Sequence, residues 1–435
     1  MPSGKEQPMN QTTYQTLLDR IQEIEIIDTH EHILSREDVR KDPLHLFRLF
    51  ENSYARLDFT SAGMPADVWQ ERQPDFIWQH WEKYQDHVIL NCFYQNIIRA
   101  LQDLYGFEGN RITKADWPEL SEKVVDAYDR EDWYEFVLKQ KAGFKVSLLD
   151  TFWSVEAFRF DPTIFTPVLR TNPFILGRQF ESRFPKGLKA PTSVETIAEE
   201  WDISLKEFES YLVLIDTAIE KYRETGAPAV KIATAYERTL QFEKVSKNEA
   251  ARLYLKAPSD LTLSARKALQ DYMAHYIILQ ATSQGLPVQI HTGILARNAN
   301  IIGNSNPEHL NELFLIYPDT RFVLLHFSFP YMQQAFSLAK MFPNVYLDFC
   351  WVPMLSKKAA VTALDEYFDL VPNNKLMWGG DAFRVEEAYA AACAAREVMA
   401  MVMAGRVDCG DLDLEAAEQL CRSVFHDNAR EFFDI

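Results

Sequence analysis

The sequence has no long hydrophobic run. Although 47% of its 435 residues are apolar, no uninterrupted apolar stretch reaches the roughly 18 residues that a membrane-spanning helix requires. The first residues, from Met1 to Gln15, are polar and lack the apolar core of a secretory signal peptide. These absences predict a protein that does not contact a membrane, and we expect it to be cytoplasmic.

Cysteine is scarce, and no two cysteines stand in a close CxxC pair. The chain contains Cys92, Cys350, Cys393, Cys409 and Cys421. An odd number of dispersed cysteines in a long chain favours reduced thiols and an intracellular setting. A disulfide framework is therefore not expected.

Positive charge is also in deficit. The chain has 45 Lys and Arg against 63 Asp and Glu, which gives a net charge of −18. Nucleic-acid binding requires clustered positive charge, so no nucleic-acid partner is expected. A small anionic substrate is still compatible with this composition, because one or two local arginines can override the field of the whole protein.

Eight apolar, β-rich runs separated by longer helical stretches are present along the chain. They span residues 24–32, 145–153, 165–174, 228–236, 287–293, 321–329, 345–352 and 375–383. Most are continuously apolar, as is typical of parallel strands covered on both faces. Strands that alternate with helices indicate βαβ units. Eight such units predict an α/β fold, a closed (β/α)₈ TIM barrel.

Two segments are longer than a single barrel helix requires. Residues 33–144 are rich in Trp, Phe and Tyr, and residues 176–222 separate the third and fourth runs. We interpret both as helical insertions, after strands 1 and 3, into one barrel domain that spans residues 1–435. Because barrel active sites form where strands end at the C-terminal face, insertions that leave from this face are expected to cover the site.

Polar residues that can bind metal or move protons recur at the predicted strands, mostly at their C-terminal ends. They are His30 and His32 in the first run, Lys231 in the fourth, His291 in the fifth, His326 in the sixth and Asp381 in the eighth. Four of the ten histidines are therefore in this set. A histidine that ends one apolar run is commonly a hydrogen-bonded core residue. The ordered recurrence at successive strand ends instead favours a common site.

The first-strand histidines have the spacing of a metal-binding pair. Residues i and i+2 of a strand point to the same side, so His30 and His32 can hold one ion. Imidazole nitrogen and carboxylate oxygen bind Zn²⁺ at about 2.0–2.2 Å, and a catalytic site keeps one position open. With His291 and Asp381, these residues make a candidate ligand set.

These motifs resemble those of the amidohydrolase superfamily, especially its amidohydrolase-related branch. The resemblance is carried by Asp-Thr-His-Glu-His at residues 28–32, Lys231, His291, His326 and Gly-Gly-Asp at residues 379–381. The aromatic insertion after the first strand, with Asn-Cys-Phe-Tyr at 91–94 and Leu-Tyr-Gly-Phe at 104–107, is similar in position and composition to that of uronate isomerases.

The resemblance implies a role for each strand-end residue. His30, His32, His291 and Asp381 would bind metal, and Asp381 would also shuttle a proton. His326 would either bind a second metal or orient the substrate and polarise its carbonyl. Lys231 would bridge two metals after carboxylation or pair with an anionic substrate group, and a buried structural lysine is the remaining alternative. We favour one divalent ion, Zn²⁺ or, as the alternative, Mn²⁺, over two.

Five further residues are candidates for substrate binding because they follow strands on the same predicted face. They are Tyr236, Arg238, Arg297, Trp351 and Arg384. An arginine can hold a carboxylate through two parallel hydrogen bonds. For each arginine a surface salt bridge is the competing interpretation, and for Trp351 it is packing against the insertion.

The sequence thus predicts a metal-dependent enzyme that hydrolyses a C–N or C–O bond of a small molecule. Non-oxidative decarboxylation and aldose–ketose isomerisation of a sugar acid are the alternatives. A barrel without catalytic activity is a fourth hypothesis, against which the complete ligand set argues. The expected partner is a small-molecule substrate, with a carboxylate as one candidate group, and self-association into a homo-oligomer is compatible with the aromatic insertion.

Overall fold

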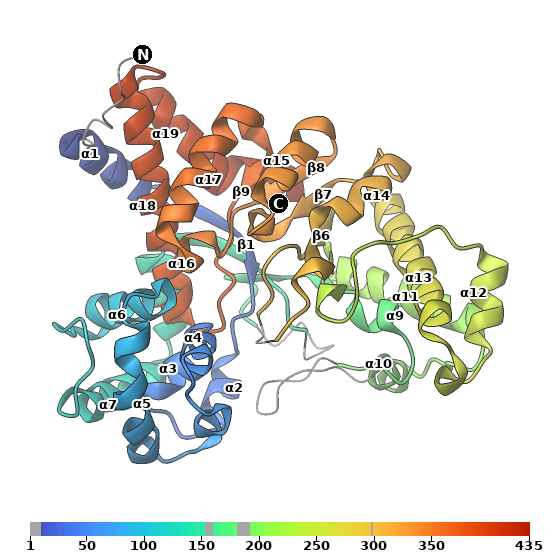
Figure 1. Ribbon diagram of the computed structural model, residues 1–435, viewed down its shortest axis with the longest axis horizontal. Coiled ribbons are helices and arrows are strands. Elements are labelled where there is room, and N and C mark those ends of the chain that lie inside the picture. Colours follow the sequence, from blue (N-terminus) through green and yellow to red (C-terminus); the bar gives the residue numbers. More distant parts are fainter. Residues whose placement is uncertain (1–9, 153–159, 181–191, 297–298) are drawn as a thin grey trace. The chain divides into compact units, whose positions relative to one another are not determined.

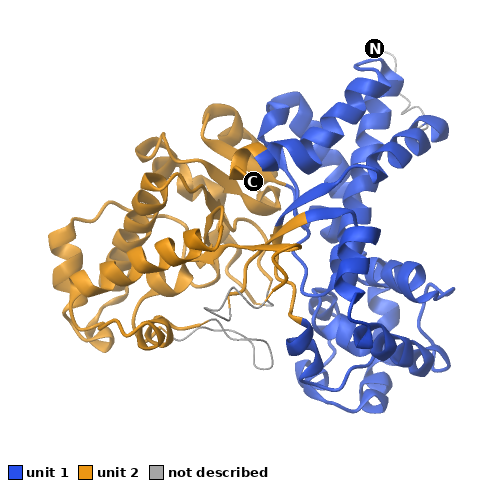
Figure 2. Ribbon diagram, turned by 180° about the vertical axis from the view of Figure 1, so that it is seen from behind, with its two compact units in different colours: residues 1–29, 36–145, 349–430 blue, residues 30–35, 146–348, 431–435 orange. Residues whose placement is uncertain are grey.

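The computed structural model describes residues 10–152, 160–180, 192–296 and 299–435. The chain divides into two compact units, coloured separately in Figure 2. Unit 1 comprises residues 1–29, 36–145 and 349–430, and unit 2 comprises residues 30–35, 146–348 and 431–435. The prediction of one domain with two insertions stays a prediction.

Each of the eight predicted strand runs contains a strand (Figure 1). The strands are β1 (Ile26–Glu31), β2 (Phe144–Leu149), β3 (Phe165–Pro167), β4 (Leu169–Arg170), β5 (Val230–Ile232), β6 (Val288–Ile290), β7 (Phe322–Leu324), β8 (Val345–Asp348) and β9 (Leu376–Met377). The third run holds both β3 and β4. Between them, Val168 donates its N–H to Leu149 of β2, and Leu169 then donates to Ala229 beside β5.

The strands are parallel and follow one another in sequence order. One sheet has the order β1-β2-β3 and the other the order β4-β5-β6-β7-β8-β9. The parallel register pairs Val230 with Val288, Val288 with Phe322, and Phe322 with Val345. All three residues of β5, β6 and β7 are buried, which explains why these runs are continuously apolar.

Backbone hydrogen bonds connect strands beyond the two sheets. Thr29 of β1 donates its N–H to the carbonyl of Trp378, the residue that follows β9, over 3.2 Å. Val168, between β3 and β4, links the third run to β2, and Leu169 links it to the residue before β5. The predicted α/β class and (β/α)₈ barrel are confirmed.

Unit 1 consists largely of helices. They are α1 (Gln11–Gln22), α2 (Arg36–Arg40), α3 (Phe47–Glu51), α4 (Ala55–Ser61), α5 (Pro74–Val88), α6 (Cys92–Tyr105), α7 (Asp116–Asp129), α8 (Trp133–Glu135), α16 (Val352–Leu355), α17 (Lys357–Leu370), α18 (Val385–Cys409), α19 (Leu414–Arg422) and the first half of α20 (Asn428–Phe433). Helices α2 to α8 fall in the aromatic segment 33–144. Their core is aromatic, with ring centroids of Trp81 4.5 Å from Phe50 and 4.3 Å from Phe59.

Helix α18 is the central helix of unit 1. It contacts α1, α6 and α17, and most of its residues are buried, including most of its alanines and methionines. No Gly or Pro interrupts its first four turns, and the helix continues through Gly405 to Cys409, because burial offsets the roughly 1 kcal/mol cost of one helical glycine. It ends at Gly410, whose φ of 83° is the left-handed conformation of a helix C-cap.

Unit 2 holds the remaining helices, several of which begin at a hydroxyl N-cap. They are α9 (Asn172–Leu176), α10 (Val194–Glu200), α11 (Phe208–Glu224), α12 (Lys247–Tyr254), α13 (Leu263–Ser283), α14 (Asn311–Ile316) and α15 (Met332–Met341). Ser193, Ser246 and Thr262 accept a backbone N–H at the starts of α10, α12 and α13. Across the described ranges, no helix combines the length and the hydropathy that crossing a membrane would demand.

Candidate metal centre

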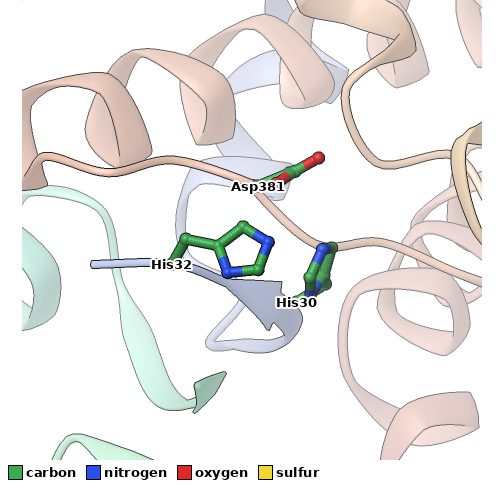
Figure 3. Close-up of side chains that lie close together, drawn as sticks. All are labelled: His30, His32 and Asp381. Carbon is green, nitrogen blue, oxygen red and sulfur yellow. The ribbon is translucent and has the colours of Figure 1, made fainter. Parts of the chain in front are cut away.

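Three of the predicted metal ligands lie close together. The ligand atoms of His30, His32 and Asp381 are all within 4.8 Å of one another, and all three residues are buried. His30 is in β1 and His32 follows its last residue, so the two side chains leave the strand on the same side. Figure 3 shows the two imidazole rings with the carboxylate beside them.

The donor atoms of this group suit a divalent cation. Burial lowers the pKa of His32 to about 3, despite the opposing charge of Asp150. Burial, followed by the charge of Lys231, also lowers the pKa of His30 well below its usual value. Both rings are therefore neutral at neutral pH and retain a lone pair for a metal. Two imidazole nitrogens and a carboxylate oxygen are ligands that Zn²⁺ and Mn²⁺ accept.

A backbone contact fixes the ring of His32. Its Nδ1 lies 2.7 Å from the carbonyl oxygen of Asp150, to which it can donate a hydrogen bond. With Nδ1 used in this way, Nε2 is the nitrogen available to an ion. Such a hydrogen bond from the other ring nitrogen is the usual means by which proteins orient a metal-binding histidine.

A buried carboxylate shared by two cations adjoins the histidines in unit 2. Asp150 Oδ2 accepts from Arg170 Nε at 2.9 Å and Nη2 at 2.7 Å, and lies 3.3 Å from Lys231 Nζ. Burial alone would raise the pKa of Asp150, but the charges of Arg170 and Lys231 outweigh it and hold the pKa at about 2. Asp150 is therefore a carboxylate throughout the physiological range.

Lys231 also contacts the first histidine. Its Nζ lies 2.6 Å from Nε2 and 3.2 Å from Nδ1 of His30, and the lysine is fully buried. Arg170 and Lys231 thus place two cations against the carboxylate of Asp150, and Lys231 lies between this carboxylate and the ring of His30.

His291 and His326 form a second pair of imidazoles. His326 Nε2 is 3.2 Å from His291 Nδ1, and His291 Nε2 can donate to the carbonyl of Ile294 over 2.9 Å. Burial, followed by the charge of His326, lowers the pKa of His291 well below its usual value. The ring of His326 lies 6.2 Å from that of His30. Metal binding by His291 stays a prediction, since the compact group described above does not include it.

The backbone after β6 and β7 is tightly constrained. His326, Phe327 and Ser328 have φ values of 66°, 46° and 55°, which non-glycine residues rarely adopt. Gly293 has a φ of 72°, and a Cβ at this position would lie 2.4 Å from the carbonyl oxygen of Phe329. Only glycine permits this approach of the two loops. Strained conformations of this kind are concentrated at functional sites.

Asp381 is held by neighbours within unit 1. Tyr54 donates its hydroxyl to Asp381 Oδ1 over 3.0 Å, and the ring of Tyr54 lies 4.3 Å from that of Trp351. The preceding residue, Gly380, donates its N–H to Asp28 Oδ1 over 3.0 Å. The same β1 segment therefore carries the first histidines and holds the loop of Asp381.

Arg384 follows Asp381 and is almost fully buried. Its Nη2 donates to Asn52 Oδ1, whereas no described residue accepts a hydrogen bond from its Nε or Nη1. Its guanidinium lies 5.7 Å from the ring centre of Tyr128. A buried guanidinium with N–H groups to spare can bind an anion.

The other predicted substrate-binding residues have different surroundings. The ring of Tyr236 lies 5.1 Å from that of His291, and its hydroxyl accepts from Ala296 N at 3.2 Å. Arg238 forms an ion pair with the buried Asp271, which is the salt-bridge alternative stated for it. Arg297 lies outside the described residues.

Three residues of these clusters were not predicted from the sequence. Asp150 directly follows β2, as His291 follows β6, so its position at a strand end was an available signal. Arg170 is the last residue of β4, within a run that otherwise indicates only a strand. Tyr54 precedes helix α4 in the aromatic segment, where no strand pattern points to a site.

Comparison with known proteins supports the resemblance. The family model described as Amidohydrolase matches residues 252–435. The protein fluG of Emericella nidulans is 34% identical over 176 residues, which are 39% of this chain and 20% of that protein. The matched part therefore spans about a fifth of the length of this curated relative.

Solved structures share the fold over the whole chain. The uronate isomerase from Thermotoga maritima superposes with a TM-score of 0.81 at 15% identity, covering 100% of both chains. The glucuronate isomerase from Caulobacter crescentus superposes with a TM-score of 0.73 at 15% identity, covering 99% of this chain and 95% of its own. At this identity the similarity establishes the fold and leaves the reaction open.

Proposed function

We propose that the chain is a metal-dependent enzyme that hydrolyses a C–N or C–O bond of a small molecule, on the premise that residues 252–435 match the family model described as Amidohydrolase. The observation that carries the proposal is the group formed by His30, His32 and Asp381. Neutral imidazoles beside a carboxylate, all buried, are typical of a catalytic metal site.

His30, His32 and Asp381 would hold one divalent ion, with His291 as the fourth predicted ligand. Zn²⁺ is the favoured ion and Mn²⁺ the alternative. When bound, such an ion polarises a substrate carbonyl and makes water a better nucleophile at neutral pH. The ion pair between Lys231 and Asp150 supports a single ion, because it engages the lysine as an ammonium group and leaves it unsuited to carboxylation.

Asp381 is the residue that would move the proton. Its Oδ1 accepts from Tyr54, which orients the carboxylate, and the second oxygen can take a proton from water and return it to the leaving group. His326, whose Nε2 points at His291, would orient the substrate carbonyl.

Arg384 supports an anionic substrate, because it is almost fully buried and none of the described residues accepts a hydrogen bond from its Nε or Nη1. A carboxylate is the small group that such cations bind most readily. We therefore propose a carboxylate-bearing substrate, with Tyr236 and Trp351 as further contacts. Roles for Arg238 and Arg297, a cytoplasmic location and homo-oligomer formation remain predictions.

Isomerisation of a sugar acid is the second candidate. The fold of the entire chain is that of proteins named uronate isomerases, and the Tyr54 hydroxyl on Asp381 supplies a second group able to exchange a proton. Decarboxylation has no comparable observation in its favour.

Metal analysis tests the proposal first. The purified protein should contain about one equivalent of Zn²⁺ or Mn²⁺, as four ligands predict. His30→Ala should lose this metal. His275→Ala should retain it, because His275 contacts Tyr317 and is not in the ligand set. A wild-type protein that stays folded and binds neither ion would refute the proposal.

Mass spectrometry of reaction products then separates the candidate reactions. Incubation with panels of N-acyl amino acids, lactones and uronates should yield products that have gained one water molecule. An unchanged mass with a new sugar isomer would favour the second candidate, and loss of carbon dioxide would favour decarboxylation. Asp381→Asn should fold normally and lose about 100-fold or more of the turnover.

A further inference from the structure

Glu387, in the first turn of α18, is a buried acid with no role in the site described so far. Its side chain is 2% exposed, although no lysine or arginine forms an ion pair with it among the described residues. A buried carboxyl group needs hydrogen-bond donors to offset its lost hydration. The donors that Glu387 finds come from two separate parts of the chain.

The first part is the start of α4. Glu387 Oε1 accepts from Ser53 Oγ at 2.7 Å and from the N–H of Tyr54 at 3.4 Å. Ser53 Oγ in turn accepts from the N–H of Ala55 over 3.1 Å, which closes the turn that begins the helix. Glu387 thereby fixes the backbone of the residue whose hydroxyl reaches Asp381.

The second part is the loop after β9. Glu387 Oε2 accepts from the N–H of Phe383 over 3.4 Å, two residues beyond Asp381. The two oxygens of one carboxyl group therefore hold Tyr54 and the Asp381 loop together. The ring of Phe383 also packs 5.6 Å from that of Tyr54, so the same two segments meet through side chains.

We propose that Glu387 is a positioning residue, which sets the Tyr54 hydroxyl against Asp381 and so prepares Asp381 to bind the metal. The inference rests on the proposed function, because it takes Asp381 to be a metal ligand. Outer hydrogen bonds of this kind typically change metal affinity about 10- to 100-fold when they are lost.

Co²⁺ binding tests the inference without a known substrate. Titration of the metal-free full-length protein, followed by calorimetry and by the visible absorption of Co²⁺, gives the dissociation constant and the ligand geometry. Glu387→Ala should bind Co²⁺ about tenfold more weakly. Glu387→Gln keeps an oxygen that accepts from Ser53 and Tyr54 and should bind nearly as tightly as the wild type.

A double-mutant comparison distinguishes positioning from general loss of structure. If Glu387 acts through Tyr54, the variant with both Tyr54→Phe and Glu387→Ala should bind Co²⁺ as weakly as Tyr54→Phe alone. Glu386→Ala is the matched control, since it removes an adjacent buried acid of α18 whose donors are Tyr105, Tyr128 and Trp133. It should lower stability and leave the Co²⁺ affinity unchanged.

The inference is overturned if Glu387→Ala binds Co²⁺ as tightly as the wild type does. It is also overturned if the fold-reductions in Co²⁺ affinity of Glu387→Ala and Tyr54→Phe multiply in the double variant. Should Glu387→Ala not fold, Ser53→Ala removes the shortest of the three hydrogen bonds to Glu387 and should weaken Co²⁺ binding in the same direction. If the wild-type protein binds no Co²⁺, or binds it without His30 and Asp381, the proposed function fails instead.

Discussion

Two buried carboxyl groups, one in each unit, are stabilised in opposite ways. Asp150 in unit 2 faces the cations Arg170 and Lys231, which hold its pKa at about 2. Glu387 in unit 1 receives a serine hydroxyl and backbone N–H groups, and burial raises its pKa to about 8. Both are almost fully buried, so their partners, and not their burial, make the difference.

The contrast shows what each cluster can do. The cations Arg170 and Lys231 keep Asp150 ionised. Neutral donors leave Glu387 uncharged over much of the physiological range, so it holds two segments together without adding charge beside Asp381. A cation in place of Ser53 would compete electrostatically with a bound metal.

The largest expected effect comes from removing the carboxylate in unit 2. Asp150→Ala leaves Arg170 and Lys231 buried without their counter-ion, and breaking a buried pair in this way costs about 3–5 kcal/mol. Denaturant unfolding at neutral pH measures the loss. Glu418→Gln, which removes the partly exposed partner of Arg20, should leave the free energy of unfolding unchanged. A stable Asp150→Ala protein would contradict the view that the cations need this carboxylate.

A smaller effect is expected from removing one neutral donor in unit 1. Glu386 accepts from Tyr128 over 2.9 Å, and loss of a hydrogen bond to a buried carboxylate in Tyr128→Phe should cost about 1.5–3 kcal/mol. Tyr389→Phe, which removes an exposed hydroxyl bonded to Asp103, is the control and should change stability by less than about 0.5 kcal/mol. Equal losses in urea unfolding would show that burial of the acceptor is irrelevant.

The last expected effect is a slope of stability with pH, which is the smallest of the three when it is counted per pH unit. The pKa of Glu387 rises from 4.5 to about 8 on folding, so the folded protein binds the extra proton between these pH values. Its contribution to stability is complete below pH 4.5 and is lost as the pH rises through about 8. Glu387→Gln should remove this decline, which amounts to at most about 1.4 kcal/mol per pH unit. Parallel stability–pH curves for wild type and variant would contradict the raised pKa.

Much of the barrel could be predicted because its signals are local. A parallel strand covered on both faces must be apolar throughout, so β5, β6 and β7 are visible as continuous runs. The strands end earlier than the runs, because residues such as His326 leave the extended conformation, with a φ of 66°. Hydrophobicity does not report where the backbone turns.

The site was only partly predictable for a related reason. His30, His32 and Asp381, which lie close together, were singled out because chemically distinctive residues recurred at strand ends. Asp150 and Arg170 were missed because an acid or an arginine at a strand end is common. The role of such a residue depends on the residue that it pairs with in the folded chain. Tyr54 was missed because its role depends on the fold of α4, which no sequence pattern links to Asp381.

The sequence by itself determined the order of strands and helices and the residues that end the strands, because these follow from hydrophobic patterning along the chain. Only the tertiary structure decided which charged and polar groups meet. Lys231 is paired with Asp150, and Glu387 with Ser53, across separations in sequence of more than 80 and 300 residues. Pairing at that range depends on side-chain geometry within a packed core, which sets both the pKa of each acid and its role in the site.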